Sequence, residues 1–88
     1  MKIKDGFVLK ELAGSYLVVP LGSQVTEFAH IIKLTDTSAF LWKKLESECE
    51  TEDLISALLE EYDVDRETAT KGVNSFVSKL KESDLLMP

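Results

Sequence analysis

The sequence has very few of the residues that bind metals or form covalent bonds. Its 88 residues include one cysteine, Cys49, and one histidine, His30. A single cysteine cannot form an internal disulfide, and these two residues fall short of the ligand cluster that a metal site needs. Cys49 lies in the acidic stretch ESECETED, which is expected to raise the pKa of the thiol and argues against a nucleophile. We therefore expect no metal site, and the lone thiol favours a reducing, cytoplasmic compartment.

Long apolar runs and cofactor-binding loops are also missing. No apolar run approaches the roughly 20 residues that a membrane span requires, and the N-terminal MKIKDGF lacks the apolar core of a signal peptide. The sequence contains neither a glycine-rich phosphate loop nor a nucleophile-elbow motif. Glu60 and Glu61 are neighbours on a predicted helix and so face different directions, unlike a catalytic pair. These absences predict a protein that is not an enzyme, has no cofactor and does not enter a membrane.

What the chain does have is the composition of a small folded domain and an uneven charge. Hydrophobic residues make up 44% and charged residues 30%, which is typical of a globular protein. This length has room for one core, so residues 1–88 are predicted to form a single domain. Residues 1–45 carry six lysines and four acids, a net charge of +2, whereas residues 46–88 carry four basic and twelve acidic residues, a net charge of −8. The overall charge of −6 disfavours nucleic-acid binding.

The first part of the chain has the pattern of short β-strands. Branched and aromatic residues fill 7–12 and 16–19 around the turn AGS, which predicts a hairpin, and Pro20 ends its second strand. Residues 30–34, HIIKL, alternate as a third strand would. We therefore expect three antiparallel strands before any helix.

The stretch LTDTSAFLW, residues 34–42, marks the change from strand to helix. Thr35, Asp36 and Thr37 can each cap a helix N-terminus by accepting a hydrogen bond from a free backbone N–H. Apolar residues then recur along one helical stripe that includes Trp42. Trp42 is therefore expected to anchor the core beneath the sheet.

Two more helices follow. The second is predicted to start at Thr51, and the third is capped by Asp65 and runs to about Ser83, with Val64 packed against the core between them. This order predicts an α+β fold, a three-stranded antiparallel sheet followed by a three-helix bundle in a winged helix-turn-helix-like arrangement. The expected members of one core are Trp42, Leu45, Leu58, Phe76 and Leu80.

Two other functions suit a small protein of this shape. Winged helix-turn-helix domains often bind DNA through a basic recognition helix, but here the third helix and its flanks mix four basic residues with four acids. DNA binding or regulation therefore stays as the alternative function. An acyl-carrier role is not supported, because the Asp-Ser-Leu attachment triplet is absent.

The order of these segments resembles the PqqD family of peptide-recognition proteins, also called RiPP recognition elements. The resemblance extends from about Gly6 to Leu86, and its segments are GFVLKELAGSYLVVPLG, IIKLTDTSAFLW, LISALLEEYDVDRETA and FVSKLKESDLL. The family commonly has asparagine at the position of Thr35 and glycine or alanine at that of Ser38. These two departures leave open which branch of the family this chain represents.

The resemblance implies a non-catalytic peptide chaperone. Family members hold the leader of a ribosomally made precursor peptide and present it to a modifying enzyme, often a radical S-adenosylmethionine (SAM) maturase. The founding member serves pyrroloquinoline quinone (PQQ) biosynthesis and relatives serve other peptides, so the product stays open. No nucleic acid or membrane is expected as a partner. The chain is expected to be a monomer or a homodimer, and whether a dimer would exchange elements stays open.

The resemblance also implies where the leader binds: as an added strand along the third strand, in a groove bordered by the third helix. An uncovered strand edge offers N–H and C=O groups to another chain. Val73, Val77 and Lys81 mark one edge of the apolar stripe of that helix. Val73 and Val77 could equally well be core residues. The opposite edge of the stripe, marked by Gly72 and Lys79, also remains a candidate border of the groove. The expected peptide-binding residues are His30, Ile31, Ile32, Lys33, Leu34, Val73, Asn74, Val77 and Lys81.

Overall fold

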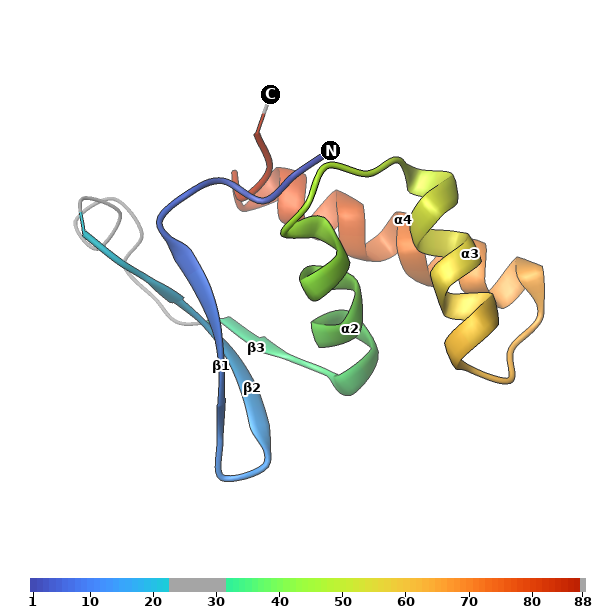
Figure 1. The fold of residues 1–88 in the computed structure, drawn as a ribbon, viewed down its shortest axis with the longest axis horizontal. Coiled ribbons are helices and arrows are strands. Elements are labelled where there is room, and N and C mark those ends of the chain that lie inside the picture. The colour runs from blue at the N-terminus through green and yellow to red at the C-terminus, as the bar shows by residue number, and fades with distance from the viewer. Residues whose placement is uncertain (23–31, 88) are drawn as a thin grey trace.

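A small antiparallel sheet lies beside helices, as Figure 1 shows. The structure is a computed structural model and describes residues 1–22 and 32–87. Its elements, in chain order, are β1 (Phe7–Leu12), β2 (Ser15–Pro20), β3 (Ile32–Leu34), α2 (Asp36–Leu45), α3 (Thr51–Glu61) and α4 (Arg66–Glu82). The strand order in the sheet is β1-β2-β3, and both neighbouring pairs are antiparallel. The predicted α+β fold, with three antiparallel strands followed by three helices, is confirmed in this described part of the chain.

A two-residue turn joins β1 to β2. Leu12 pairs with Ser15, and between them Ala13 and Gly14 have φ values of 52° and 79°. Positive φ at both central residues matches the twist of the flanking strands, and glycine adopts it at little cost. The turn therefore sets the register of the whole hairpin.

Strand β3 pairs with β2 and completes the described sheet. The paired residues are Tyr16 with Leu34, Leu17 with Lys33 and Val18 with Ile32. The predicted strand covered residues 30–34, and its last three residues form β3. His30 and Ile31 lie outside the described residues.

Side-chain caps begin α2 and α4. Thr35 Oγ1 accepts a hydrogen bond from the Ser38 amide at 3.1 Å at the start of α2. Asp65 Oδ1 accepts one from the Thr68 amide at 2.7 Å at the start of α4. The second bond stabilises the charged carboxylate and so lowers the pKa of Asp65. Thr35, one of three candidate caps, and Asp65 are thereby confirmed as caps.

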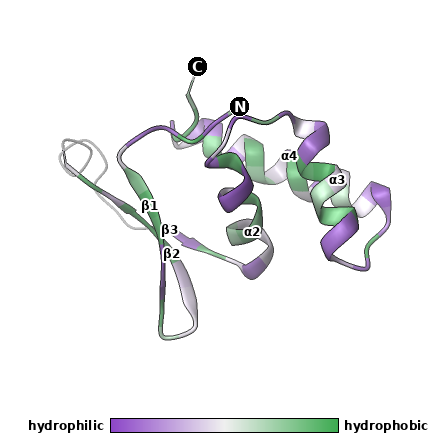
Figure 2. Cartoon of the chain, in the orientation of Figure 1, coloured by the Kyte–Doolittle hydropathy of each residue, from purple (hydrophilic) through white to green (hydrophobic). Residues whose placement is uncertain are grey.

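One hydrophobic cluster joins the sheet to the helices, and Trp42 of α2 is its largest fully buried side chain. Val18 of β2 is equally buried, which ties the sheet to the helices. Figure 2 shows hydrophobic and hydrophilic residues interspersed along the helices, as expected of helices that bury one face. The prediction that Val64 packs against the core is wrong, since the Val64 residue is 38% exposed. The predicted core residues are all buried, which confirms them as a set: Trp42, Leu45, Leu58, Phe76 and Leu80.

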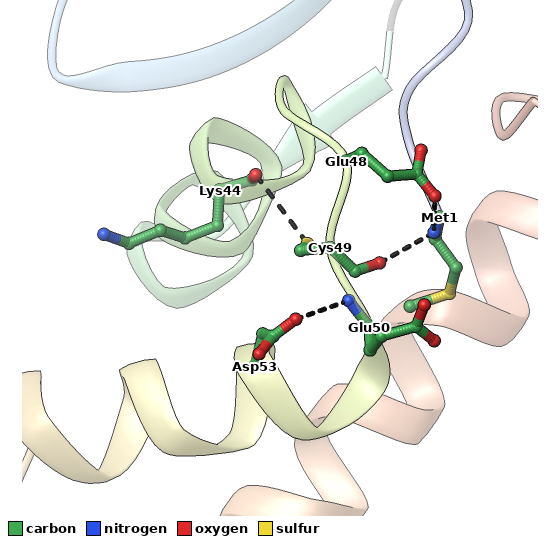
Figure 3. A network of polar contacts seen from close by, with 6 residues as sticks. All are labelled: Met1, Lys44, Glu48, Cys49, Glu50 and Asp53. Carbon is green, nitrogen blue, oxygen red and sulfur yellow. Dashed lines mark hydrogen bonds and ion pairs between the residues drawn. The ribbon is translucent and has the colours of Figure 1, made fainter.

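The N-terminal segment holds the ends of the helices together. Ile3 forms a bridge with Leu86 and donates its amide to the Leu45 carbonyl oxygen at 2.9 Å. The Cys49 amide donates to the Met1 carbonyl oxygen, also at 2.9 Å, and Figure 3 shows these two residues side by side. Burial raises the pKa of the Cys49 thiol, in line with the expected low reactivity. No helix within residues 1–22 and 32–87 combines the length and the apolar character needed to cross a membrane.

Substitution of Leu45 tests this core. Leu45 is completely buried, so Leu45→Ala should lower the free energy of unfolding by about 2–5 kcal/mol, because the change leaves a cavity. Leu12→Ala is the matched control: Leu12 is 66% exposed, so the same truncation should change that free energy by less than about 0.5 kcal/mol. Urea denaturation followed by circular dichroism gives both values. Equal effects of the two substitutions would contradict the placement of Leu45.

Candidate functional site

A groove of about 300 Å³ lies between β3 and the C-terminal half of α4. Its apolar lining residues are Ile32, Leu34, Phe76, Leu80 and Leu85. Its polar lining residues are Lys33, Thr35, Ser38, Lys79, Glu82 and Ser83. Phe76, Leu80 and Leu85 are buried, whereas Lys79 and Glu82 are exposed. The groove therefore has an apolar base and a polar rim.

Strand β3 forms one wall of the groove and lies at an edge of the sheet. β2 separates it from β1, so within the described chain β3 has a strand neighbour on one side only. Pairs in an antiparallel ladder alternate between hydrogen-bonded and non-hydrogen-bonded. The two-residue turn makes Leu12 and Ser15 a hydrogen-bonded pair. The alternation then directs the N–H and C=O of Tyr16 and Val18 toward β3, so their partners Leu34 and Ile32 are hydrogen-bonded to β2. Lys33 lies between these two pairs, and its N–H and C=O therefore point away from β2 and toward the unpaired edge.

Thr35 and Ser38, at the start of α2, line the groove beside β3. The Thr35 hydroxyl donates to Ser38 Oγ at 3.1 Å, in addition to accepting from the Ser38 amide. Both positions differ from the residues that the resemblance to the PqqD family led us to expect. The departures form one paired contact, which couples the end of β3 to the first turn of α2.

Two lysines at the groove have no acidic partner among the described residues. The ion pairs use the Met1 amino group, Lys4, Arg66 and Lys71. Lys43 and Lys44 lie over aromatic rings. Lys33 and Lys79 make neither kind of contact, so an acidic group that enters the groove meets unpaired cations.

The structure brings part of the predicted peptide-binding set to this groove. Ile32, Lys33 and Leu34 form its strand wall. Ile32 and Leu34 are half-buried and pack against the core, while Lys33 is exposed. The two other predicted strand residues, His30 and Ile31, lie outside the described residues.

The predicted residues of α4 lie elsewhere. Val73 is completely buried and Val77 is 7% exposed, so both belong to the core, as the sequence left open. Asn74 is exposed but does not line the groove, and Lys81 lines a separate hollow near the N-terminus. The helix edge at the groove is the opposite one, which carries Lys79. That the nine residues listed from the sequence contact a bound peptide remains a prediction.

Phe76 and Ser83 are groove residues that the sequence did not assign. With Lys79 they are spaced three and four apart, so the three side chains share one face of α4. That spacing identifies a helix face. It does not identify which face lies against β3, because the rotation of α4 depends on the packing of the whole core.

These features define a small α+β domain in which, among the described residues, one edge of β3 is unpaired and lies beside a groove. No three histidine, cysteine, aspartate or glutamate side chains in residues 1–22 and 32–87 are grouped so that they could hold a metal ion. A family model described as "Coenzyme PQQ synthesis protein D (PqqD)" matches residues 15–86. The chain therefore belongs to the PqqD family, as the sequence resemblance predicted. A search of curated proteins found no match.

Two solved structures share this fold. One is described as "TbiB1 in Complex with the TbiA(beta) Leader Peptide" and has a TM-score of 0.77 and 26% identity, over 98% of this chain and 94% of that chain. The other is described as "Lasso peptide synthetase B1 complexed with the leader peptide" and has a TM-score of 0.76 and 21% identity, over 99% and 96%. The likeness extends over nearly the full length of both neighbours and supports the observed architecture.

The cap at the groove can be tested directly. Thr35→Ala should lower the free energy of unfolding by about 1 kcal/mol, because α2 loses a side-chain acceptor for its first turn. Thr35→Ser keeps the hydroxyl and should leave that free energy nearly unchanged. Urea denaturation of the three proteins measures the difference. A loss for serine as large as that for alanine would show that the hydroxyl does not act as a cap.

Proposed function

We propose that this protein binds the leader of a ribosomal precursor peptide by strand addition and presents it to a modifying enzyme. The observation that carries the proposal is the open edge of β3 beside an apolar groove. A leader that pairs with β3 lies directly over this groove. The protein then acts as a recognition module and performs no chemistry itself.

Backbone pairing explains how such a site accepts an extended peptide. The outward N–H and C=O of Lys33 offer one donor and one acceptor, whatever the sequence of the incoming strand. Alternate side chains of an added strand point to the same side. Every second leader residue can therefore reach the base formed by Phe76, Leu80 and Leu85. Affinity comes from the ladder and selectivity from the groove.

Charge adds a second criterion for the leader. Lys33 and Lys79 are exposed and unpaired within the described chain, whereas Glu82 is the one acid at the groove. We expect a leader that places an acidic residue near these lysines and apolar residues over the base. Because the rim is exposed, the lysines should act mainly on association rate and salt dependence.

The comparisons support this function. The chain belongs to the PqqD family, and the 26% identical TbiB1 structure is described as a complex with a leader peptide. By resemblance to the family, the proposed modifying enzyme is a radical SAM maturase and the proposed location is the cytoplasm. PQQ biosynthesis is one candidate pathway among those that the family serves.

DNA binding, the alternative from the sequence, has no described surface in its favour. α3 has acids in its first turn and no basic residue in its last. Two of the four cations in and beside α4, Arg66 and Lys71, are already paired with acids. Binding to duplex DNA should therefore be weak and should be lost at moderate salt.

Substitution of Lys33 tests strand addition. Lys33→Pro removes the N–H that faces the open edge and should weaken leader binding by about tenfold or more. Lys33→Ala keeps that N–H and should change the affinity only severalfold, by loss of the charge. The measurement is isothermal titration with a synthetic leader of the chain's precursor peptide, after circular dichroism shows that both variants fold. Equal affinities of the proline and alanine variants would argue against an added strand.

A pair of charge reversals tests which edge of α4 borders the leader. Lys79→Glu places an acid at the groove and should weaken leader binding severalfold at low salt, with a smaller effect at high salt. Lys81→Glu makes the same change in net charge on the other side of the helix and should have less than about a twofold effect. Fluorescence anisotropy with a labelled leader gives both values. A larger effect of Lys81→Glu would show that the leader borders the edge of α4 that carries Lys81, which the sequence favoured.

A further inference from the structure

A further hollow, distinct from the groove and from the hollow near the N-terminus, lies at the junction of α2, α3 and α4. It has a volume of about 200 Å³ and shares no lining residue with the groove beside β3. Its walls include Leu58 and Tyr62 near the end of α3, Val64 in the connection, and Thr68 and Gly72 in α4. The proposed binding of a leader makes no use of this hollow.

Two residues of this hollow are unfavourable choices for an isolated domain. Gly72 lies inside the 17-residue helix α4, where glycine is among the least favourable residues. A Cβ atom at Gly72 would meet no described atom within 4 Å, so close packing inside the chain does not require glycine there. Val64 leaves 38% of its surface exposed at the same hollow. Both features keep an apolar cavity open to the outside.

The charge around the hollow is also unfavourable for the chain alone. α2 and α4 each end with two lysines, which suit the negative end of the helix dipole, whereas α3 has no basic residue in its last turn. α3 ends instead at Glu60 and Glu61, and Asp63 and Asp65 follow in the connection to α4. Figure 2 shows hydrophilic residues at the end of α3. Four acids thus lie within six residues, in the same segment as Tyr62 and Val64, which line the apolar cavity.

The cations nearest in the chain do not neutralise these four acids. Arg66 pairs with Glu52, and Lys71 pairs with Glu67 at 3.2 Å. The described surface around the hollow therefore keeps a net negative charge. A partner that brings cations to this rim attracts the acids and offsets the unfavourable dipole interaction at the end of α3.

We infer that this acidic-rimmed hollow, formed by the end of α3, residues 62–65 and the first half of α4, is a docking surface for the modifying enzyme. The complementary surface on the enzyme presents one apolar side chain between lysine or arginine residues. Charge complementarity favours a cationic partner over an anionic polymer or a second copy of this chain, whose net charge is −6. The inference rests on the proposed function, because it names the partner that receives the leader.

The position of the hollow suits transfer of a leader. Thr35 and Ser38 line the groove, and Thr37 between them in sequence lines the hollow, so the first turn of α2 separates the two sites. Gly72 and Lys79 are seven residues apart on α4, which corresponds to about 10 Å along the helix axis. An enzyme docked at the hollow would lie next to the leader without covering β3.

The test uses the full chain, a synthetic leader of its precursor peptide and the radical SAM maturase proposed as its partner. Gly72→Leu fills the hollow from an exposed helix position and should raise the dissociation constant for the enzyme by about tenfold or more. Ser78→Leu adds a leucine to an exposed position on the same helix that lines neither site, and it should leave that constant within about twofold. Biolayer interferometry measures the enzyme, anisotropy measures the leader, and both variants should bind the leader as the wild type does.

A charge reversal gives a second test of the inference, which does not depend on the folding of the leucine variant. Glu61→Lys should weaken enzyme binding severalfold at low salt and less at high salt. Glu46→Lys, at the exposed end of α2, makes the same change in net charge and should have little effect. Wild-type enzyme affinity in both Gly72→Leu and Glu61→Lys, with leader binding intact, would overturn this inference alone. Absence of leader binding to the wild-type chain would instead overturn the proposed function.

Discussion

The proposed site depends on the pairing of β3 on one side only. Three register pairs hold β3 against β2, and Ile32 and Leu34 also pack on the core, so the strand is fixed without a second strand neighbour among the described residues. An open strand edge is a risk, because it can pair with any extended chain. Its length of three residues limits that risk, and the apolar base of the adjoining groove adds selection by side chain.

Helix α4 connects the two surfaces that the account assigns. Its buried stripe, with Val73 and Leu80, fixes the helix in the core. Its last turns then contribute Phe76 and Lys79 to the groove, while Gly72 lines the hollow at the end of α3. The charges also differ: the unpaired Lys33 and Lys79 line the groove together with Glu82, whereas acids flank Tyr62 and Val64 of the hollow. One rigid element can therefore hold a peptide on one side and an enzyme beside it.

Periodicity and capping chemistry predicted the elements well, because both act within a few residues. The Thr35 and Asp65 caps and the buried stripe around Trp42 follow from local sequence. The helix edge at the groove did not follow, since both edges of the α4 stripe fit a helical pattern equally well. Long-range packing decides between them: it rotates Val73 into the core and brings the edge with Lys79 to β3.

The most direct test of the central claim is an amide chemical-shift titration of the folded, isotope-labelled chain with its cognate leader. The account predicts the largest changes at residues 32–34 and 76–83, where β3 and α4 border the groove, with α3 unaffected. Slow hydrogen exchange at the Lys33 amide should appear only in the complex, because that N–H gains an acceptor from the added strand. Changes confined to α3, with residues 32–34 and 76–83 silent, would contradict strand addition at β3.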